Sequence, residues 1–125
     1  MFSPRLAAAA AALALGAPAS APAQPAGLRI VVWSFGFAPK PILLRAGRPV
    51  TLTFENRSGS SHDFTAKAFF AYSRIISGDA REGEVELKGY DTKSVTLIPR
   101  AGTYKAHCSH FFHEPLGMSD TIIVS

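Results

Sequence analysis

Residues 50–55 read Val-Thr-Leu-Thr-Phe-Glu and alternate strictly between apolar and polar side chains. Successive side chains of a β-strand point to opposite faces, so this stretch predicts a strand that buries Val50, Leu52 and Phe54 on one face. It belongs to a set of short segments that are rich in Val, Ile, Thr and Phe and are separated by Gly, Pro or Asn: residues 28–33, 49–56, 93–98, 103–108 and 120–124. Short strands between such turn residues predict an all-β sandwich or barrel.

Residues 67–83 do not follow the strand pattern. Phe69, Tyr72 and Ile76 recur at helical spacing, and the following Gly78-Asp79 pair would end a helical turn. We therefore expect a short helix or ordered loop around residues 67–78, with its apolar stripe packed in the core. The charged stretch at residues 82–86 is typical of a solvent-exposed strand edge.

The first 23 residues have the features of a secretory signal peptide. A basic start ends at Arg5, residues 6–16 are almost purely Ala and Leu, and Ala-Pro-Ala at 21–23 fits a signal-peptidase site. The apolar run is about half of the roughly 20 residues that a membrane-spanning helix needs, which favours a cleaved signal over a membrane anchor. We expect a signal peptide at 1–23 and one domain at 24–125, periplasmic or otherwise exported and without stable membrane insertion.

Charge and cysteine content narrow the function. The net charge is +4, but the Lys and Arg residues are scattered and form no run, so we expect no nucleic-acid partner. Cys108 is the single cysteine of the chain. Small exported domains usually pair their cysteines, which leaves three interpretations: a buried free thiol, an intermolecular disulfide or a metal ligand.

The neighbours of Cys108 favour a metal ligand. Residues 104–118 read Tyr-Lys-Ala-His-Cys-Ser-His-Phe-Phe-His-Glu-Pro-Leu-Gly-Met and combine a thiol, imidazoles and a thioether. Soft ligands select Cu(I), imidazole also suits Cu(II), and two His with one Cys and a weak axial Met form a known copper geometry. His62 is the only histidine outside this stretch and follows another predicted strand.

We therefore predict one copper ion held by His62, Cys108, His113 and Met118. Zinc is the main rival metal, although one Cys with one Met is a poor structural zinc set. His110 stays open as an alternative to His113, because the sequence does not forbid it.

The chain resembles the cupredoxins, the type 1 copper proteins that include plastocyanin and azurin. The resemblance covers nearly all of residues 24–125 and rests on four segments: Phe-x-Pro at 37–39, the Ile, Leu, Gly, Val, Phe and Asn pattern at 42–56, His-Asp-Phe at 62–64, and Gly-x-Tyr-x3-Cys at 102–108. Cys-x4-His-x4-Met is one of the ligand-loop spacings of that family. The resemblance implies a Greek-key β-sandwich and a type 1 copper centre.

The sequence departs from the family pattern at two places. Asp63 stands where many cupredoxins have Asn, and we expect it to accept a hydrogen bond from Ser109 or its backbone. His107 beside Cys108 is similar to copper oxidases and nitrite reductases, in which this histidine binds a second copper. Those sites need several more histidines and the chain has 4 in all, so we predict no catalytic copper and no enzyme.

Two functions remain open. A copper ion in this ligand set can change oxidation state with little ligand movement, which favours a single-electron carrier. The alternative is a copper-handling protein for tolerance, delivery or assembly, which the additional His107 and His110 favour. We expect a monomer that meets redox partner proteins or copper-trafficking proteins, with an apolar docking collar at Phe111, Phe112, Pro115 and Leu116.

Overall fold

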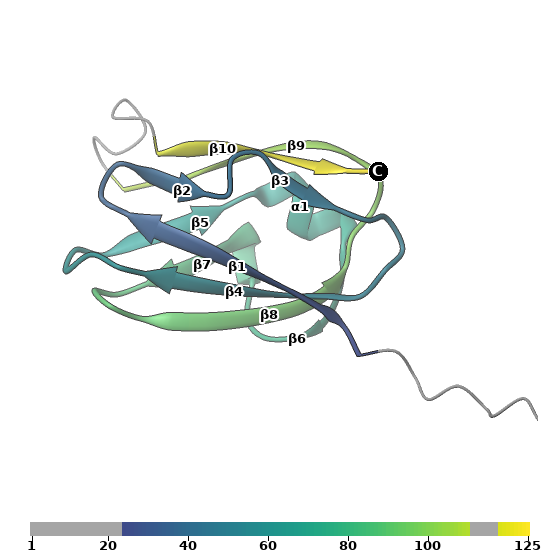
Figure 1. Cartoon of the computed structure of the whole chain (residues 1–125), viewed down its shortest axis with the longest axis horizontal. Helices are drawn as coiled ribbons and strands as arrows, with labels where there is room; N and C mark the ends of the chain where they lie inside the picture. Colours follow the sequence, from purple (N-terminus) through teal and green to yellow (C-terminus); the bar gives the residue numbers. More distant parts are fainter. Residues whose placement is uncertain (1–23, 111–117) are drawn as a thin grey trace, which may run out of the picture.

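Two five-stranded sheets face each other across a shared apolar core (Figure 1). The computed structural model describes residues 24–110 and 118–125, so the signal-peptide prediction for 1–23 lies outside it. The first sheet has the order β2 (Gly36–Ala38), β1 (Ala26–Trp33), β4 (Val50–Asn56), β8 (Thr92–Ile98), β6 (Arg74–Ser77). The second has the order β3 (Ile42–Leu44), β10 (Ser119–Val124), β9 (Gly102–His107), β5 (His62–Thr65), β7 (Glu84–Leu87).

Strand β4 confirms the alternation from which the fold was predicted. Val50, Leu52 and Phe54 are buried, and the residues between them are only partly so. β4 pairs in parallel with β1 and antiparallel with β8, with Leu52 opposite Leu28 and Val95. Full burial of an aliphatic or aromatic side chain contributes about 1.5–3 kcal/mol, so this strand is a main source of stability.

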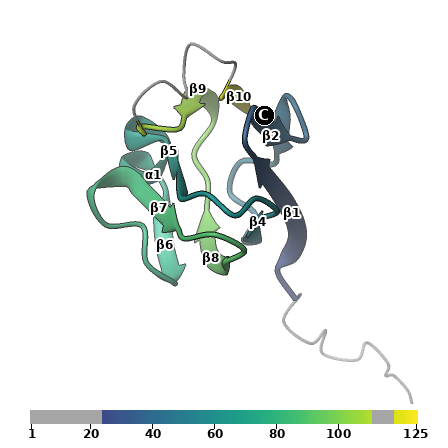
Figure 2. The same ribbon diagram turned by 90° about the vertical axis from the view of Figure 1, so that its left-hand side faces the viewer.

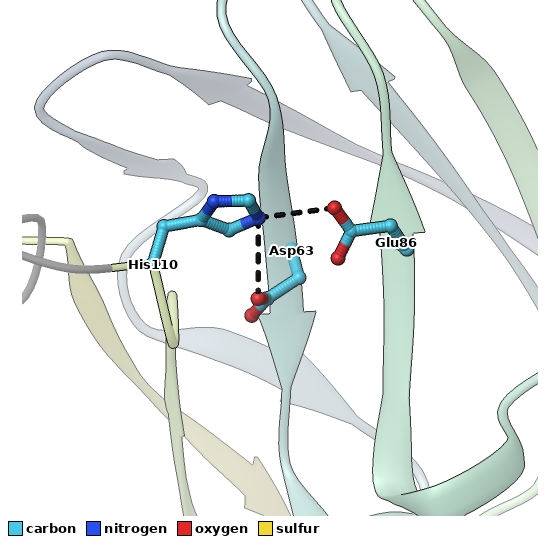
Figure 3. A group of neighbouring side chains, drawn as sticks. All are labelled: Asp63, Glu86 and His110. Atoms are coloured by element: carbon cyan, nitrogen blue, oxygen red, sulfur yellow. Dashed lines mark hydrogen bonds and ion pairs between the residues drawn. The ribbon is translucent and has the colours of Figure 1, made fainter.

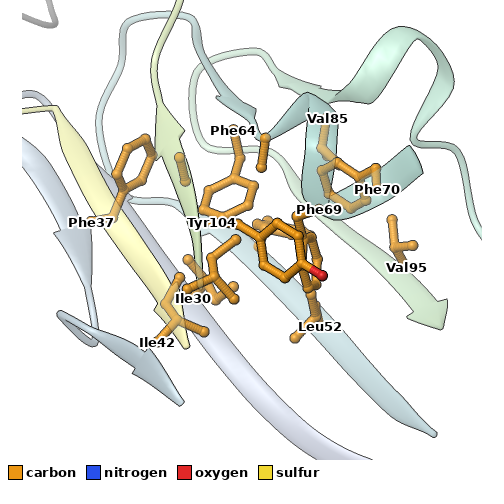
Figure 4. Close-up of a cluster of buried hydrophobic side chains, with 14 of the residues drawn as sticks. Ile30, Phe37, Ile42, Leu52, Phe64, Phe69, Phe70, Val85, Val95 and Tyr104 are labelled. Carbon is orange, nitrogen blue, oxygen red and sulfur yellow. The ribbon is translucent and has the colours of Figure 1, made fainter. Parts of the chain in front are cut away.

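Aromatic rings fill the space between the sheets beside the helix α1 (Lys67–Tyr72) (Figure 4). Phe69 meets Tyr104 edge to face at 5.6 Å between ring centroids, and Phe70 meets Phe64 at 6.2 Å. Edge-to-face pairs of this kind add to the area that the rings bury. The Tyr104 hydroxyl donates to the Arg100 carbonyl at 2.8 Å, which satisfies the one polar atom of that ring.

The helix is shorter than the 67–78 segment expected from the spacing of apolar residues. It ends at Tyr72 because Ser73 is extended, with φ −83° and ψ 154°. Ile75 and Ile76 then belong to β6, an edge strand paired with β8, since β-branched side chains fit a pleated sheet better than a helix. The expected packing of the apolar stripe in the core holds for Phe69 but is wrong for Tyr72 and Ile76, which are 58% and 53% exposed. A 3₁₀ turn, η1 (Arg81–Gly83), leads into β7, which confirms a strand edge in the charged stretch.

Three strand ends of the second sheet meet at one end of the sandwich (Figures 1 and 2). β9 ends one residue before Cys108, and β10 starts one residue after Met118, with His107 opposite Ser119. β5 runs antiparallel to β9 and pairs Thr65 with His107, which brings the start of β5 alongside the residues that follow β9. Within the described ranges, no helix is long and apolar enough to cross a membrane.

Candidate metal centre

The structure brings together three of the four predicted copper ligands. His62, Cys108 and Met118 are each at most 1% exposed. The Cys108 sulfur lies 3.9 Å from Nδ1 of His62, and the Cys108 amide donates to the Met118 carbonyl at 3.0 Å. His113, the fourth predicted ligand, and the collar at 111, 112, 115 and 116 lie outside the described residues.

The donor atoms fit a metal ion. A nitrogen about 2.0 Å and a sulfur about 2.3 Å from one ion lie a little under 4 Å apart when the angle at the ion is about 120°. The observed 3.9 Å between Nδ1 of His62 and the Cys108 sulfur agrees with that separation. A buried thiol beside an imidazole, with the buried Met118 directly before β10, is a soft donor set of the kind that copper prefers.

The surroundings of Cys108 act on its protonation in two directions. Burial raises the pKa of the thiol, whereas hydrogen bonds from the backbone amides of Asp63 and His110 lower it in part. The Asp63 amide nitrogen is 3.5 Å from the sulfur. Since a metal binds the thiolate, the two amides are placed to stabilise the form of the sulfur that acts as a ligand.

Asp63 ties the loop of Cys108 to strand β5, as the sequence predicted. One carboxylate oxygen accepts from the Ser109 amide at 2.8 Å and from the Thr65 hydroxyl at 2.6 Å. The other accepts from the Ser109 hydroxyl. A carboxylate only accepts hydrogen bonds, so three donors around one buried side chain make a rigid connection between the two ligand-bearing segments.

Asn56 holds the turn before His62, a role that was not predicted although Asn56 belongs to the family pattern at 42–56. Its side-chain amide donates to the carbonyls of Ser60 at 2.8 Å and Lys88 at 3.0 Å, while its oxygen accepts from the Ser58 amide at 3.0 Å. The signal was present in the alternation of β4, because Asn56 occupies the buried position after Val50, Leu52 and Phe54. A polar residue at such a position needs hydrogen-bond partners, and these fix the path of the chain.

The two additional histidines differ in their surroundings. His107 is half-buried at the end of β9. His110 directs Nε2 towards Oε1 of Glu86 at 3.0 Å and Oδ2 of Asp63 at 3.6 Å (Figure 3). Its ring centroid is 6.5 Å from that of His62.

Comparison with known proteins identifies the family. A family model described as a cupredoxin-like domain matches residues 5–124, so the chain belongs to the cupredoxin-like family, and the resemblance seen in the sequence is confirmed. Membership implies that the chain binds copper, in line with the donor set at His62 and Cys108. No curated protein matches the sequence.

Several solved structures share the fold. Auracyanin A, a "blue" copper protein from Chloroflexus aurantiacus, is 22% identical with a TM-score of 0.58, over 82% of this chain and 100% of that one. An auracyanin from Roseiflexus castenholzii is 18% identical with a TM-score of 0.61, over 82% and 99%. A multicopper oxidase from Campylobacter jejuni is 14% identical with a TM-score of 0.64, over 83% of this chain but only 31% of that one. These likenesses confirm the β-sandwich.

Proposed function

We propose that the chain is a periplasmic protein that binds one copper ion through His62, Cys108, His113 and Met118 and transfers single electrons between redox partners. The observation that carries the proposal is the buried pair of Cys108 and His62, whose donor atoms are 3.9 Å apart. When bound, copper in a thiolate, imidazole and thioether set supplies reversible one-electron chemistry. The periplasmic location rests on the signal-like residues 1–23.

The residues around the ligands suit electron transfer because they restrict movement. Asn56 fixes the turn before His62, and Asp63 connects β5 to Ser109 beside Cys108. Ligands held in this way keep one arrangement in both oxidation states, which lowers the energy of rearrangement. Burial of His62, Cys108 and Met118 also excludes water from the donor atoms.

The end of the sandwich that holds the ligands also offers an apolar surface for a redox partner. Trp33 ends β1 and Phe35 lies in the connection from β1 to β2, and the two side chains are 39% and 61% exposed. This connection is at the same end of the sandwich as the end of β9 (Figure 1). Exposed aromatic residues are frequent at protein–protein interfaces. We extend the proposed docking collar to these two residues.

We further propose that the chain is an electron carrier without catalytic activity of its own. It corresponds to 31% of the Campylobacter oxidase but to 100% and 99% of the two auracyanins. A second candidate function is copper handling, which one observation favours: His110 lies beside Glu86 in an accessible position next to the buried ligands.

The visible absorption spectrum of the Cu(II)-loaded protein tests the proposal. We expect an intense thiolate-to-copper charge-transfer band that is lost in Cys108→Ser. His107→Asn is the matched control, because it removes a neighbouring imidazole that is outside the proposed ligand set, and it should keep the band. Absence of the band from the unmodified protein would overturn the type 1 assignment.

A second experiment separates the two functions. Rapid reduction and reoxidation by periplasmic redox proteins supports the carrier, and charged substitutions at Phe35 should slow it. If cells that lack the protein keep normal electron transfer between their periplasmic redox proteins but become sensitive to copper, copper handling is favoured instead.

A further inference from the structure

Asp63, Glu86 and His110 bring one ligand atom each close together (Figure 3). They lie beside the buried pair of His62 and Cys108, since the His110 ring is 6.5 Å from that of His62 and the Asp63 amide is 3.5 Å from the Cys108 sulfur. We propose that these three side chains bind a divalent first-row transition-metal ion of the Zn²⁺ and Cu²⁺ class, at a site separate from the copper ligands. The three side chains come from β5, from the edge strand β7 and from the residues after β9. The inference does not depend on the proposed electron-transfer function.

The distances between the ligand atoms suit a shared ion. Nε2 of His110 is 3.0 Å from Oε1 of Glu86 and 3.6 Å from Oδ2 of Asp63, and all three ligand atoms lie within 4.8 Å of one another. Nitrogen and oxygen ligands about 2.0–2.2 Å from one ion are about 2.9 Å apart at a right angle and about 3.6 Å apart at 120°. An ion therefore fits among these atoms with only small side-chain movements.

Asp63 retains the acceptor capacity that the site needs. An ionised carboxylate has about four lone-pair positions. The Ser109 amide, the Thr65 hydroxyl and the Ser109 hydroxyl occupy three of them, and two of these bonds are on Oδ1. The remaining position belongs to Oδ2, which is the oxygen nearer to His110. The hydrogen bonds from Ser109 and Thr65 also hold the Asp63 carboxylate in place, as hydrogen bonds to a metal-binding side chain usually do.

The site is open to solvent on the side of Glu86. The side chains of His110 and Glu86 are 33% and 46% exposed, so an ion can enter and Glu86 can adjust its position. Glu86 also borders a surface hollow with more acidic than basic residues: Asp79, Glu82, Glu84 and Glu86 with Arg81 and Lys93. Such a surface raises the local concentration of cations.

The donor set selects the class of ion. One imidazole and two carboxylates suit zinc and copper(II), whereas calcium and magnesium prefer oxygen ligands alone. Copper(II) has the higher affinity for such a set, and zinc is the better probe because it leaves the visible spectrum of the copper centre unobscured. The simpler explanation is that His110 only forms an ion pair with Glu86, and the experiment distinguishes the two.

Zinc titration of the copper-loaded protein tests the site, with calorimetry for affinity and the imidazole ¹⁵N resonances of His110 for location. We expect one Zn²⁺ per chain beyond the copper, with a shift of the His110 signals. Glu86→Gln should weaken binding by about tenfold or more, because it removes a ligand oxygen charge. Glu84→Gln makes the same charge change on the same face of β7 and should alter the affinity by less than about twofold.

Three results would overturn the proposal: no zinc binding beyond the copper site, zinc binding without a shift at His110, or equal weakening by the two Gln variants. The same titration of Cys108→Ser separates this site from the copper centre. That variant should keep the His110 shift and its dependence on Glu86. If the unmodified protein lacks the charge-transfer band but binds zinc in this way, the copper proposal fails and the zinc site stands.

Discussion

Asp63 and Asp120 are both buried carboxylates of the second sheet, but their surroundings are opposite. Asp63 is 1% exposed and accepts three hydrogen bonds from Ser109 and Thr65. Asp120 is 4% exposed, accepts from the Thr121 amide at 2.7 Å, and has no partner for Oδ2 among the described residues. Burial raises the pKa of Asp120. A buried carboxylate thus stabilises the fold where donors converge on it and destabilises it where they do not.

Replacement of Asp63 should have the largest effect. Asp63→Ala leaves the part-buried amide and hydroxyl donors of Ser109 and the buried Thr65 hydroxyl without their acceptor, which should lower the free energy of unfolding by about 3 kcal/mol. Urea denaturation measures it, and weaker copper binding should accompany it. Asp63→Asn keeps one acceptor oxygen and the side-chain shape, so its loss should be about 1 kcal/mol. Equal losses in the two variants would contradict the role assigned to the three bonds.

Asn56→Ala should have the next largest effect and extends the comparison to a neutral side chain. Its amide and oxygen satisfy the carbonyls of Ser60 and Lys88 and the amide of Ser58, so its removal should destabilise the fold by about 2 kcal/mol. The spectrum of bound copper should shift as well, because the turn leads to His62. Ser60→Ala is the control, since only the backbone of Ser60 takes part. An unchanged spectrum in Asn56→Ala would show that the turn does not position His62.

Asp120→Asn should stabilise the protein at neutral pH, by about 1 kcal/mol, because it removes a charge that lacks a full set of donors. The raised pKa gives the pH dependence. Below the ordinary pKa of an aspartic acid, Asp120 is protonated in both states and the two proteins should be nearly equal in stability. As the pH rises through the raised pKa, the unmodified protein loses stability relative to the variant. Thermal unfolding of both proteins between pH 3 and pH 8 checks this, and a constant difference would contradict it.

Glu55 offers the smallest expected effect. It lies at the surface between Arg29 and Arg57, and the hydrogen bond from Arg57 is the main cause of its lowered pKa. Exposed ion pairs contribute little because water and salt screen them. Glu55→Gln should therefore leave the unfolding midpoint within measurement error. A clear destabilisation would mean that surface charges matter as much as the buried carboxylates.

The sequence predicted the parts of the fold that repeat a pattern. The alternation of residues 50–55 identified β4, and the predicted strand at 103–108 corresponds to β9 and the Cys108 that follows it. β5 was not predicted, since all four of its residues are buried and three are polar or charged, so no alternation marks it. Ile76 fitted a helical stripe, but pairing with β8 placed it in a strand.

The metal centre was predicted from the chemical types of the donor residues and less from where the strands place them. A soft donor set identified His62, Cys108 and Met118, which the structure places together, while the His113 assignment stays a prediction. The Asp63 bond to Ser109 was also expected. The proximity of Glu86 to His110 was not, because it depends on the pairing of β5 with β7, two strands whose antiparallel register the sequence does not reveal.

The pairing of β3 with β10 has a consequence for the order of assembly. Residues 42–44 can complete their sheet only with residues 122–124, and the backbone of Ser125 bonds to Leu44 and Ala46 at 3.1 and 2.9 Å. Contacts between such distant parts of a chain form late, because a long loop must close first. Met118 immediately precedes this last strand. In a chain that emerges from its N-terminus onwards, the ligand end of the sandwich therefore stays incomplete until residues 119–124 are free to pair.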